Sequence, residues 1–104
     1  MTLPQMPAGL TPRGGTPEFT EKTLPGALKS DHSLPAGRWG RLHVLEGRVI
    51  FIDDSSGERY QLVGPCEFDI PPQAVHHLEL DGPLTCRVDF FGDEIPARPD
   101  SEAL

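Results

Sequence analysis

The sequence predicts an all-β fold in a single domain. The chain has 104 residues, which suits one domain with one hydrophobic core. It contains 12 prolines and 11 glycines, and this content favours short strands and turns over long helices. Short apolar runs alternate with turn residues, and no window shows a sustained apolar repeat at helical spacing. These observations together indicate a β-sandwich or barrel.

A series of short strands is expected, each ended by residues that favour turns. The candidates are residues 19–23, 27–32, 41–46, 48–52, 58–63, 66–70, 75–80 and 84–91. In this interpretation Gly47 closes a hairpin, and the polar run 53–57 forms a hairpin or meander loop. The proline pair at 71–72 cannot donate to a central ladder, so it ends the strand before it.

The two ends of the chain differ in composition from the middle. Residues 1–15 are rich in proline and glycine and poor in large apolar side chains, so we expect a flexible lead-in there. Residues 93–104 combine prolines with several acidic residues, and we expect a flexible tail. The β-domain then spans residues 16–92.

Charge and targeting signals exclude several classes of partner. The formal net charge is −7 and no run of lysine and arginine is present, so we expect no nucleic acid and no membrane as partner. No secretory signal and no bilayer-spanning apolar run is visible, and we expect a cytoplasmic protein. In that compartment Cys66 and Cys86 are expected to be free thiols.

Residues alternate between the two faces of a strand, and this alternation separates two neighbouring histidines. In the strand 75–80, His76 shares a face with Leu78, so we expect His76 to point inward and His77 to point outward. The strand 48–52 carries apolar residues on both faces. That pattern indicates a two-layer sandwich or a dimer interface.

Two segments carry a resemblance to a known family: WGRLHVLEG at 39–47 and PPQAVHH at 71–77. A glycine-closed hairpin followed by a proline-initiated segment with histidines is the layout of a small cupin barrel. Further matching positions are TPEFTEKTLP at 16–25, Leu28, His32, Gly37 and the pair Phe90-Phe91. On these residues the chain resembles the TehB/YeaR-like domain, a small cupin-type domain associated with tellurite resistance in bacteria.

The resemblance implies a double-stranded β-helix with a cavity at one end and a link to tellurite or other oxyanion stress. It also implies either a free-standing protein or a domain attached to a methyltransferase. The chain shows no glycine-rich strand–helix unit that could bind a methyl donor, so we expect no transferase activity in it. We expect a stress-response domain that holds a small anion or a metal–anion complex at a histidine-lined mouth.

Histidines suggest a metal at that mouth. His32 and His76 lie at family-matching positions, and neutral imidazoles on neighbouring strands bind one divalent Zn, Ni, Fe or Cu ion. A third ligand is needed, and His43 is the candidate if its face of the strand is interior. Gly40 occupies the usual cupin glutamate position, and no His-x-His pair exists. The alternative is that His32 and His76 are hydrogen-bonded residues of a metal-free polar pocket.

We expect a bound small molecule or oxyanion to contact His32, Trp39, His76 and Phe90. Trp39 is interpreted as a core or cavity-wall aromatic, or alternatively as a lid over the mouth. Phe90 and its neighbour point to opposite faces, so one of them enters the barrel. Two other functions stay open: a metal-dependent enzyme with a reduced ligand set, and a structural module that forms a homodimer.

Overall fold

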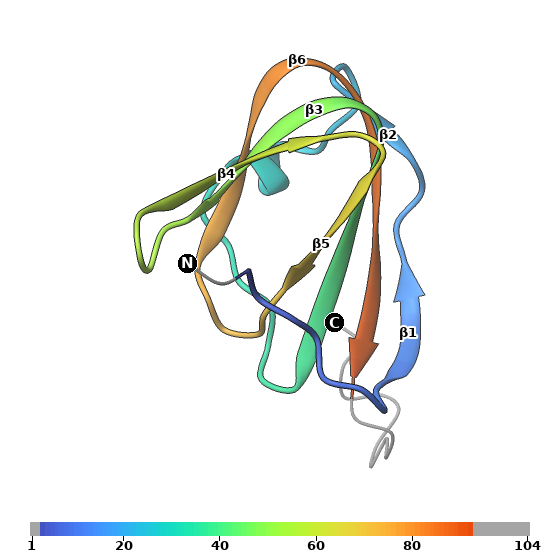
Figure 1. The fold of residues 1–104 in the computed structure, drawn as a ribbon, viewed down its shortest axis with the longest axis vertical. Coiled ribbons are helices and arrows are strands. Elements are labelled where there is room, and N and C mark those ends of the chain that lie inside the picture. The colour runs from blue at the N-terminus through green and yellow to red at the C-terminus, as the bar shows by residue number, and fades with distance from the viewer. Residues whose placement is uncertain (1–2, 93–104) are drawn as a thin grey trace.

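The computed structural model of the protein describes residues 3–92 (Figure 1). Within these residues one antiparallel sheet of six strands is accompanied by one short 3₁₀ helix. The elements are β1 (Thr11–Gly15), β2 (Phe19–Thr20), η1 (Gly26–Lys29), β3 (Arg38–Asp53), β4 (Glu58–Val63), β5 (Cys66–Ile70) and β6 (His76–Gly92). The expected all-β class and single domain are therefore confirmed.

Two long strands, β3 and β6, form the centre of the sheet. They pair antiparallel along their length, from Arg38 opposite Gly92 to Asp53 opposite His76. The second edge of β3 pairs with β5 and then with β4. The second edge of β6 pairs with β2 and then with β1. The start of β6, with His76 as its first residue, is therefore fixed against the end of β3.

The centre of the sheet bends at Gly47. The register between β3 and β6 shifts between Val44 and Glu46, and again between Gly47 and Val49, which marks β-bulges. Gly47 has a φ of 80°, and a Cβ atom there would collide with the carbonyl oxygen of Pro83. The expected hairpin at Gly47 is thus wrong. The bulge accommodates this turn-forming residue, so the chain continues as one bent strand.

The bend lets the two halves of the sheet enclose one hydrophobic core. Its buried side chains are Leu24, Leu42, Val44, Val49, Phe51, Phe68, Ile70, Leu78, Leu84, Cys86 and Val88. Each is at most 6% exposed, and their removal from water is the main stabilising contribution. Among the described residues His76 is the one buried polar side chain, at 2% exposure. Its predicted inward position is confirmed.

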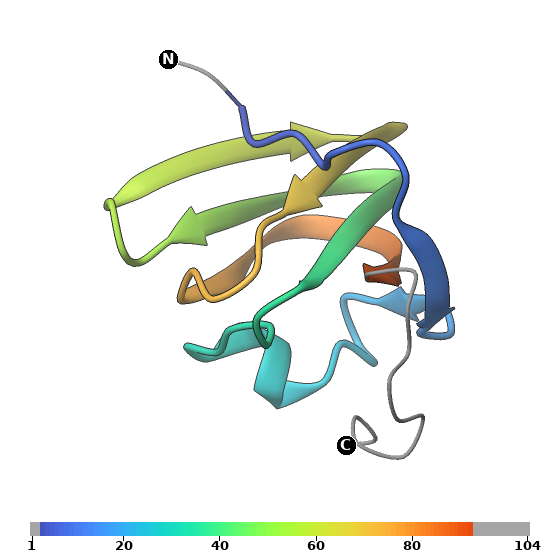
Figure 2. The ribbon, with the colours of Figure 1, turned by 90° about the horizontal axis from the view of Figure 1, so that it is seen from below.

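The sheet is open. β1 lies at one edge and β4 at the other, and no ladder within residues 3–92 joins these two edges. Figure 2 shows the N-terminal segment crossing the side formed by β4 and β5, with η1 on the opposite side of the molecule. A closed barrel needs its edge strands to pair. The arrangement therefore supports an all-β fold but gives no support to the cupin-type barrel.

The N-terminal part of the chain joins the sheet in ways that its composition does not indicate. β1 pairs with the end of β6 although it lies in the expected flexible lead-in, because backbone pairing needs no apolar side chains. The strand expected at 27–32 is instead η1 followed by an isolated bridge between His32 and His76. The expected tail at 93–104 lies outside the described residues. None of the helices in residues 3–92 has the length and apolar character to cross a membrane.

Candidate functional site

The first candidate site is a pair of histidines at the start of β6. The backbone of His32 bridges that of His76, with N···O distances of 3.0 and 2.8 Å. Their imidazole rings meet edge to face, with centroids 4.3 Å apart and an interplanar angle of 68°. The structure therefore brings together two of the predicted site residues from distant parts of the sequence.

Hydrogen bonds orient both rings in the same way. Nδ1 of His32 lies 2.9 Å from the carbonyl oxygen of Ser30, and Nδ1 of His76 lies 2.8 Å from that of Ala74. A carbonyl oxygen only accepts, so each Nδ1 carries a proton. In the neutral rings Nε2 then holds a lone pair. This orientation suits either a metal ligand or a hydrogen-bond acceptor.

His76 is buried and packs against aromatic side chains. Burial disfavours the imidazolium and lowers the pKa of His76, while a backbone hydrogen bond acts in the opposite direction. Phe51 stacks on its ring with centroids 5.0 Å apart, and Phe68 lies 4.6 Å from Phe51. Tyr60 completes the aromatic wall. Its hydroxyl donates a 2.6 Å hydrogen bond to Glu58, which raises the pKa of Tyr60 to about 12.

His43, the expected third metal ligand, lies on the outer face of β3. Its neighbours Leu42 and Val44 point into the core, so strand alternation directs His43 away from it. Nδ1 is 3.3 Å from a carboxylate oxygen of Glu67, and Nε2 is 2.9 Å from one of Asp89. Nε2 is buried, and no well-aligned hydrogen bond from the described residues reaches it. The structure does not bring His43 to the other two histidines.

The histidine pair fits the expected transition metal only in part. It offers two imidazole nitrogens, but no His, Cys, Asp or Glu of residues 3–92 joins them as a third ligand. Zinc sites use at least three protein ligands. The three-histidine metal centre expected from the sequence is therefore not assembled, because the outer face of β3 holds the third histidine.

Trp39 and Phe90 do not join the histidine pair either. Trp39 lies near the beginning of β3, whereas His76 pairs with Asp53 at its end. A Cβ atom on Gly40 would contact core side chains, so Trp39 beside it faces outward. Phe90 packs against the core from the inner face. Of the four expected ligand contacts, only His32 and His76 are therefore brought together.

A second cluster lies on the outer side of β6, and the sequence analysis did not identify it. His77 faces outward, as predicted, with Nδ1 2.7 Å from Oδ2 of Asp54 and 3.3 Å from Oδ1 of Asp31. Its Nε2 lies 3.7 Å from Oε2 of Glu79. The hydrogen bond with Asp54 is the main cause that raises the pKa of His77. Asp54 comes from the β3–β4 turn and Asp31 from the segment after η1, so no local pattern indicated their contact.

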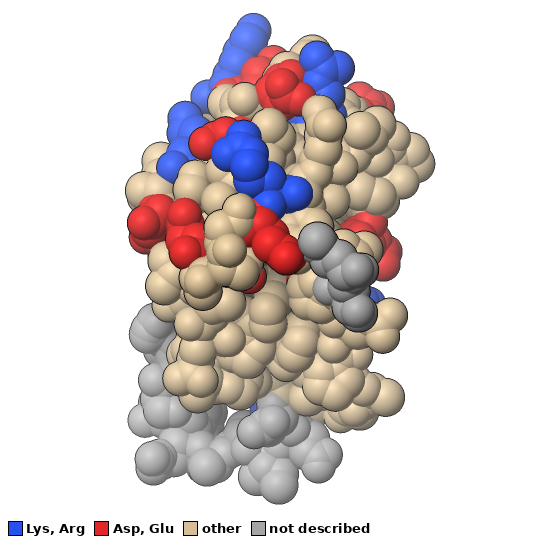
Figure 3. All heavy atoms as spheres, turned by 60° about the vertical axis from the view of Figure 1, so that its left-hand side comes forward, with Lys and Arg blue, Asp and Glu red and all other residues tan. Residues whose placement is uncertain are grey.

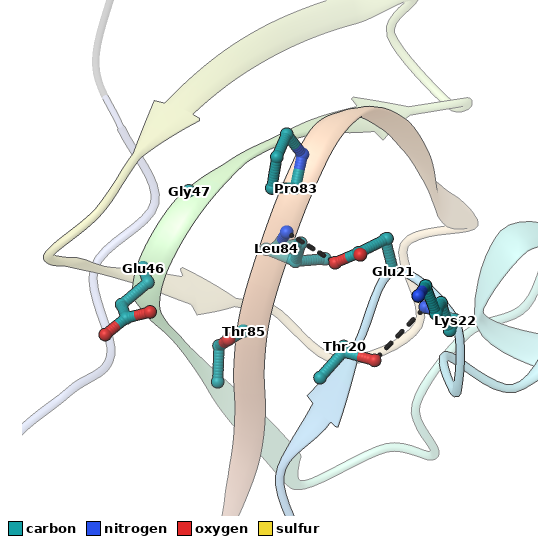
Figure 4. Close-up of a pocket in the computed structure, with 8 residues that line it drawn as sticks. All are labelled: Thr20, Glu21, Lys22, Glu46, Gly47, Pro83, Leu84 and Thr85. Carbon is teal, nitrogen blue, oxygen red and sulfur yellow. Dashed lines mark hydrogen bonds between the residues drawn. The ribbon is translucent and has the colours of Figure 1, made fainter.

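An open hollow lies beside the bend of the sheet (Figure 4). Its volume is about 330 Å³, and its lining residues are Thr20, Glu21, Lys22, Glu46, Gly47, Pro83, Leu84 and Thr85. Glu21 points toward β6 and accepts a 3.0 Å hydrogen bond from the N–H of Leu84, which lowers the pKa of this carboxyl. The carboxylate therefore joins the segment after β2 to β6. None of the predicted site residues lines this hollow.

The two cysteines are free thiols, as expected. Burial raises the pKa of both, and that of Cys86 reaches about 11. Both thiols stay protonated near neutral pH, which makes them poor nucleophiles. Cys86 instead fills the core as a small apolar side chain.

Comparison with known proteins identifies the family. The family model of the TehB-like domain matches residues 15–88, a range that contains both histidines of the pair. The chain belongs to the TehB-like domain family. The TehB resemblance is therefore confirmed. The cupin-type description is not supported.

The curated relatives of this TehB-like domain are longer proteins. Two come from Haemophilus influenzae, strains 10810 and ATCC 51907, and both are named probable S-adenosyl-L-methionine-dependent methyltransferase TehB. Each is 31% identical over an alignment of 81 residues, and the match covers 72% of this chain but 28% of the relative. The chain thus spans less than a third of the length of the curated relatives that it matches.

Two solved structures share the fold. The crystal structure of TehB from Haemophilus influenzae has a TM-score of 0.77 at 26% identity, covering 88% of this chain and 34% of that chain. A crystal structure of a protein from Escherichia coli strain K12 has a TM-score of 0.80 at 20% identity, covering 89% of this chain and 100% of that chain. At 20% identity the second likeness shows the fold alone.

The comparisons overturn the expected function. The sequence analysis predicted a cupin-like anion-binding domain, with a metal-dependent cupin enzyme or a dimerisation module as alternatives. The curated relatives are named methyltransferases instead, which indicates a methyltransferase-related family. A glycine beside a strand and histidines on later strands were insufficient to define a cupin. In the structure that glycine forms a bulge, and the sheet stays open.

Proposed function

We propose that this chain is an accessory β-domain of a TehB-type system, acting with an S-adenosylmethionine-dependent methyltransferase domain in tellurite resistance. One observation carries the proposal: the match covers 72% of this chain but 28% of relatives named as methyltransferases. The shared part is therefore one section of larger proteins that are named for methyl transfer. We assign this chain the role of that section.

The enclosed core supports a domain that folds without its catalytic partner. The two halves of the bent sheet pack on each other, and the core side chains are at most 6% exposed. A domain with its own core can be attached to a catalytic domain or produced apart from it. The accessory role is compatible with both arrangements.

In this proposal the methyl donor binds to the partner domain. Nucleotide-type cofactors bind where a parallel strand leads into a helix whose N-terminus faces the ligand. Residues 3–92 contain an antiparallel sheet and one 3₁₀ helix of four residues. The contribution assigned to this chain is therefore to contact and position the catalytic domain.

The surface offers polar contacts for such a partner. Figure 3 shows a face on which acidic and basic side chains are intermixed. Elsewhere in the described residues, ion pairs join Arg59 to Glu79 at 3.0 Å and Arg41 to Asp69 at 2.7 Å. Complementary charge on two protein surfaces mainly sets the orientation and the rate of their association. We expect association with the catalytic domain to weaken as the salt concentration rises.

A chimera tests the accessory role. The matched section of Haemophilus influenzae TehB is replaced by this chain, and growth on tellurite is measured in tellurite-sensitive bacteria. The chimera is expected to restore growth, whereas TehB without its matched section restores less. A chimera with Gly47→Val is the control, because a side chain at this bulge collides with the backbone of β6.

Biochemical assays complete the test. The isolated chain is expected to transfer no methyl group from labelled S-adenosylmethionine, and the chimera is expected to transfer it at a rate close to that of TehB. Methyl transfer by the chain alone would contradict the proposal. So would a folded chimera that performs no better than the shortened TehB.

A further inference from the structure

Three separate segments bring Asp31, Asp54 and His77 together on the outer side of β6. Asp31 follows η1, Asp54 lies in the β3–β4 turn, and His77 is the second residue of β6. The backbone bridge next to Asp31 joins its segment to β6, and the N–H of Asp54 donates a 2.8 Å hydrogen bond to the carbonyl of Val75. The backbone therefore fixes the position of both carboxyl groups relative to the imidazole.

The spacing of the side-chain atoms matches that of ligands around one metal ion. One ligand atom from each of the three residues lies within 4.8 Å of the other two. The Nδ1 atom of His77 is 2.7 Å from Asp54 and 3.3 Å from Asp31. Nitrogen and oxygen ligands at about 2.0–2.1 Å from Zn²⁺ lie about 2.9–3.4 Å apart in octahedral or tetrahedral sites. Small side-chain adjustments would place all three around a common ion.

The charges of the cluster are not balanced without a cation. Nδ1 of His77 can donate one hydrogen bond, and Asp54 accepts it, so Asp31 faces the same nitrogen without one. None of the ion pairs that arginine or lysine forms within residues 3–92 includes either aspartate. A divalent ion in place of the Nδ1 proton would neutralise both carboxylates.

A third carboxylate lies on the opposite side of the imidazole. Oε2 of Glu79 lies 3.7 Å from Nε2 of His77, whereas both aspartates face Nδ1. A carboxylate behind a histidine ligand favours the tautomer that has its proton on the far nitrogen. The metal-bound form requires this tautomer, because the lone pair on Nδ1 then binds the ion; without the ion, Nδ1 carries the proton that Asp54 accepts. With an ion at Nδ1, a small approach of Glu79 would let its carboxylate accept a hydrogen bond from Nε2–H.

We propose that Asp31, Asp54 and His77 bind one divalent transition-metal ion of the Zn²⁺ type, with water completing its coordination. One imidazole and two carboxylates suit Zn²⁺ or Co²⁺, whereas Ca²⁺ and Mg²⁺ prefer sites made of oxygen alone. The side chain of His77 is 18% exposed and that of Asp31 67%, so an ion reaches the cluster directly from solvent. The bound ion joins the segment after η1, the β3–β4 turn and β6.

This site is separate from the histidine pair and independent of the proposed methyltransferase partnership. His76 faces the core, whereas His77 faces outward from the same strand. A metal held by His32 and His76 would use their Nε2 atoms, because both Nδ1 atoms face carbonyl oxygens. A metal at the new site uses Nδ1 of His77. The two locations can therefore be distinguished by the nitrogen atom that responds.

Calorimetric titration of the metal-free full chain with ZnCl₂ tests the site, with CaCl₂ as the comparison. We expect one Zn²⁺ ion per chain, and at least about tenfold weaker binding in Asp54→Asn and in Asp31→Asn. Two control variants are expected to bind Zn²⁺ as tightly as the unchanged chain does. His32→Ala removes one side chain of the histidine pair, and Asp81→Asn removes a carboxylate elsewhere on β6. Circular dichroism verifies that each variant is folded, and the exposure of Asp31 makes its variant the safest.

Nitrogen NMR of the histidine side chains gives a second readout. On Zn²⁺ addition we expect the nitrogen chemical shift of Nδ1 of His77 to change. The chemical shifts of both Nε2 atoms of the histidine pair should stay the same. Absence of Zn²⁺ binding would overturn the proposal. Binding that His32→Ala abolishes and Asp54→Asn leaves intact would also overturn it, because the ion would then occupy the histidine pair.

Discussion

His76 and His77 are neighbours in the sequence but occupy opposite environments. His76 is 2% exposed and stacks on Phe51, and its burial lowers its pKa. His77 lies among carboxylates, and its hydrogen bond with Asp54 raises its pKa. One step along a strand therefore reverses the direction of the shift, because successive side chains enter opposite faces of the sheet. A single strand thus presents one histidine to the apolar core and the next to carboxylates on the outer face.

The two shifts give folding stability opposite pH dependences. The pKa of His76 is lower in the folded than in the unfolded chain, so its contribution is present above about pH 6.5 and is lost as the pH falls through the folded pKa. The pKa of His77 is raised by folding, so its contribution is present below about pH 6.5 and is lost as the pH rises through the folded pKa. Separate variants are needed to measure the contributions of His76 and His77 to the pH dependence of stability.

The largest effect is expected from Phe51→Ala, which removes the ring stacked on His76. Loss of this buried side chain should reduce the free energy of unfolding by about 3–5 kcal/mol. Water that enters the cavity should raise the pKa of His76 toward 6.5, with little change at His77. Urea denaturation and histidine NMR titration measure the two quantities. Ile50→Ala on the outer face is the control, and an unchanged His76 pKa in a folded Phe51→Ala protein would contradict the burial argument.

Gly47→Ala tests whether the bend of the sheet between the two ends of β3 requires glycine. A Cβ atom at this position collides with the carbonyl oxygen of Pro83, and the positive φ adds strain. We expect a loss of at least about 2 kcal/mol in unfolding free energy. Gly57→Ala is a matched control, because Gly57 has a φ of 83° but nothing within 4 Å of a Cβ atom, so about 1 kcal/mol is expected. Equal losses would show that the contact with Pro83 does not matter.

Tyr60→Phe probes the polar rim of the aromatic wall beside His76. It removes the hydrogen bond to Glu58 but keeps the ring, so we expect a loss of about 1 kcal/mol in unfolding free energy. The chain has one tyrosine, and its ultraviolet titration should give a pKa of about 12. Glu58→Gln should lower this pKa toward 10. An unchanged Tyr60 pKa in the Glu58→Gln variant would show that this hydrogen bond does not form in solution.

The smallest effect is expected from Asp54→Asn in protein kept metal-free with a chelator. The variant should lower the pKa of His77 and reduce stability below pH 6.5 by about 0.5 kcal/mol, because the pair is partly exposed and screened by solvent. The pKa of His76 should not change. Thermal denaturation as a function of pH, together with NMR titration, measures both. A parallel shift at His76 would show that the two faces of β6 are coupled.

Much of the sheet could be predicted from local pattern. The structure places β4 at Glu58–Val63 and β5 at Cys66–Ile70, the same bounds that turn residues and alternation indicated. The bend at Gly47 could not be predicted in this way. A glycine followed by a new apolar run is the same local sequence pattern in a hairpin and in a bulge. The pairing of β3 with β6 on both sides of Gly47 distinguishes the two.

The candidate sites show a similar division. The inward direction of His76 and the outward direction of His77 follow from alternation along one strand. The convergence of His77 with Asp31 and Asp54 has no local signal, because the residues come from a strand, a loop and a turn. The exclusion of His43 from the histidine pair depends on which face of β3 the core covers.

The sequence by itself determined the all-β class, the bounds of β4 and β5, the faces of the two neighbouring histidines and the resemblance to the TehB-like family. It divided β6 into two strands, at 75–80 and 84–91, where the structure has one. Only the tertiary structure decided that the sheet stays open, that β3 and β6 bend together, and which carboxylates face His77. The physical reason is the distance along the sequence over which each interaction acts. Alternation and turn propensity act over a few residues, whereas strand pairing and loop position depend on hydrogen bonds between distant parts of the chain.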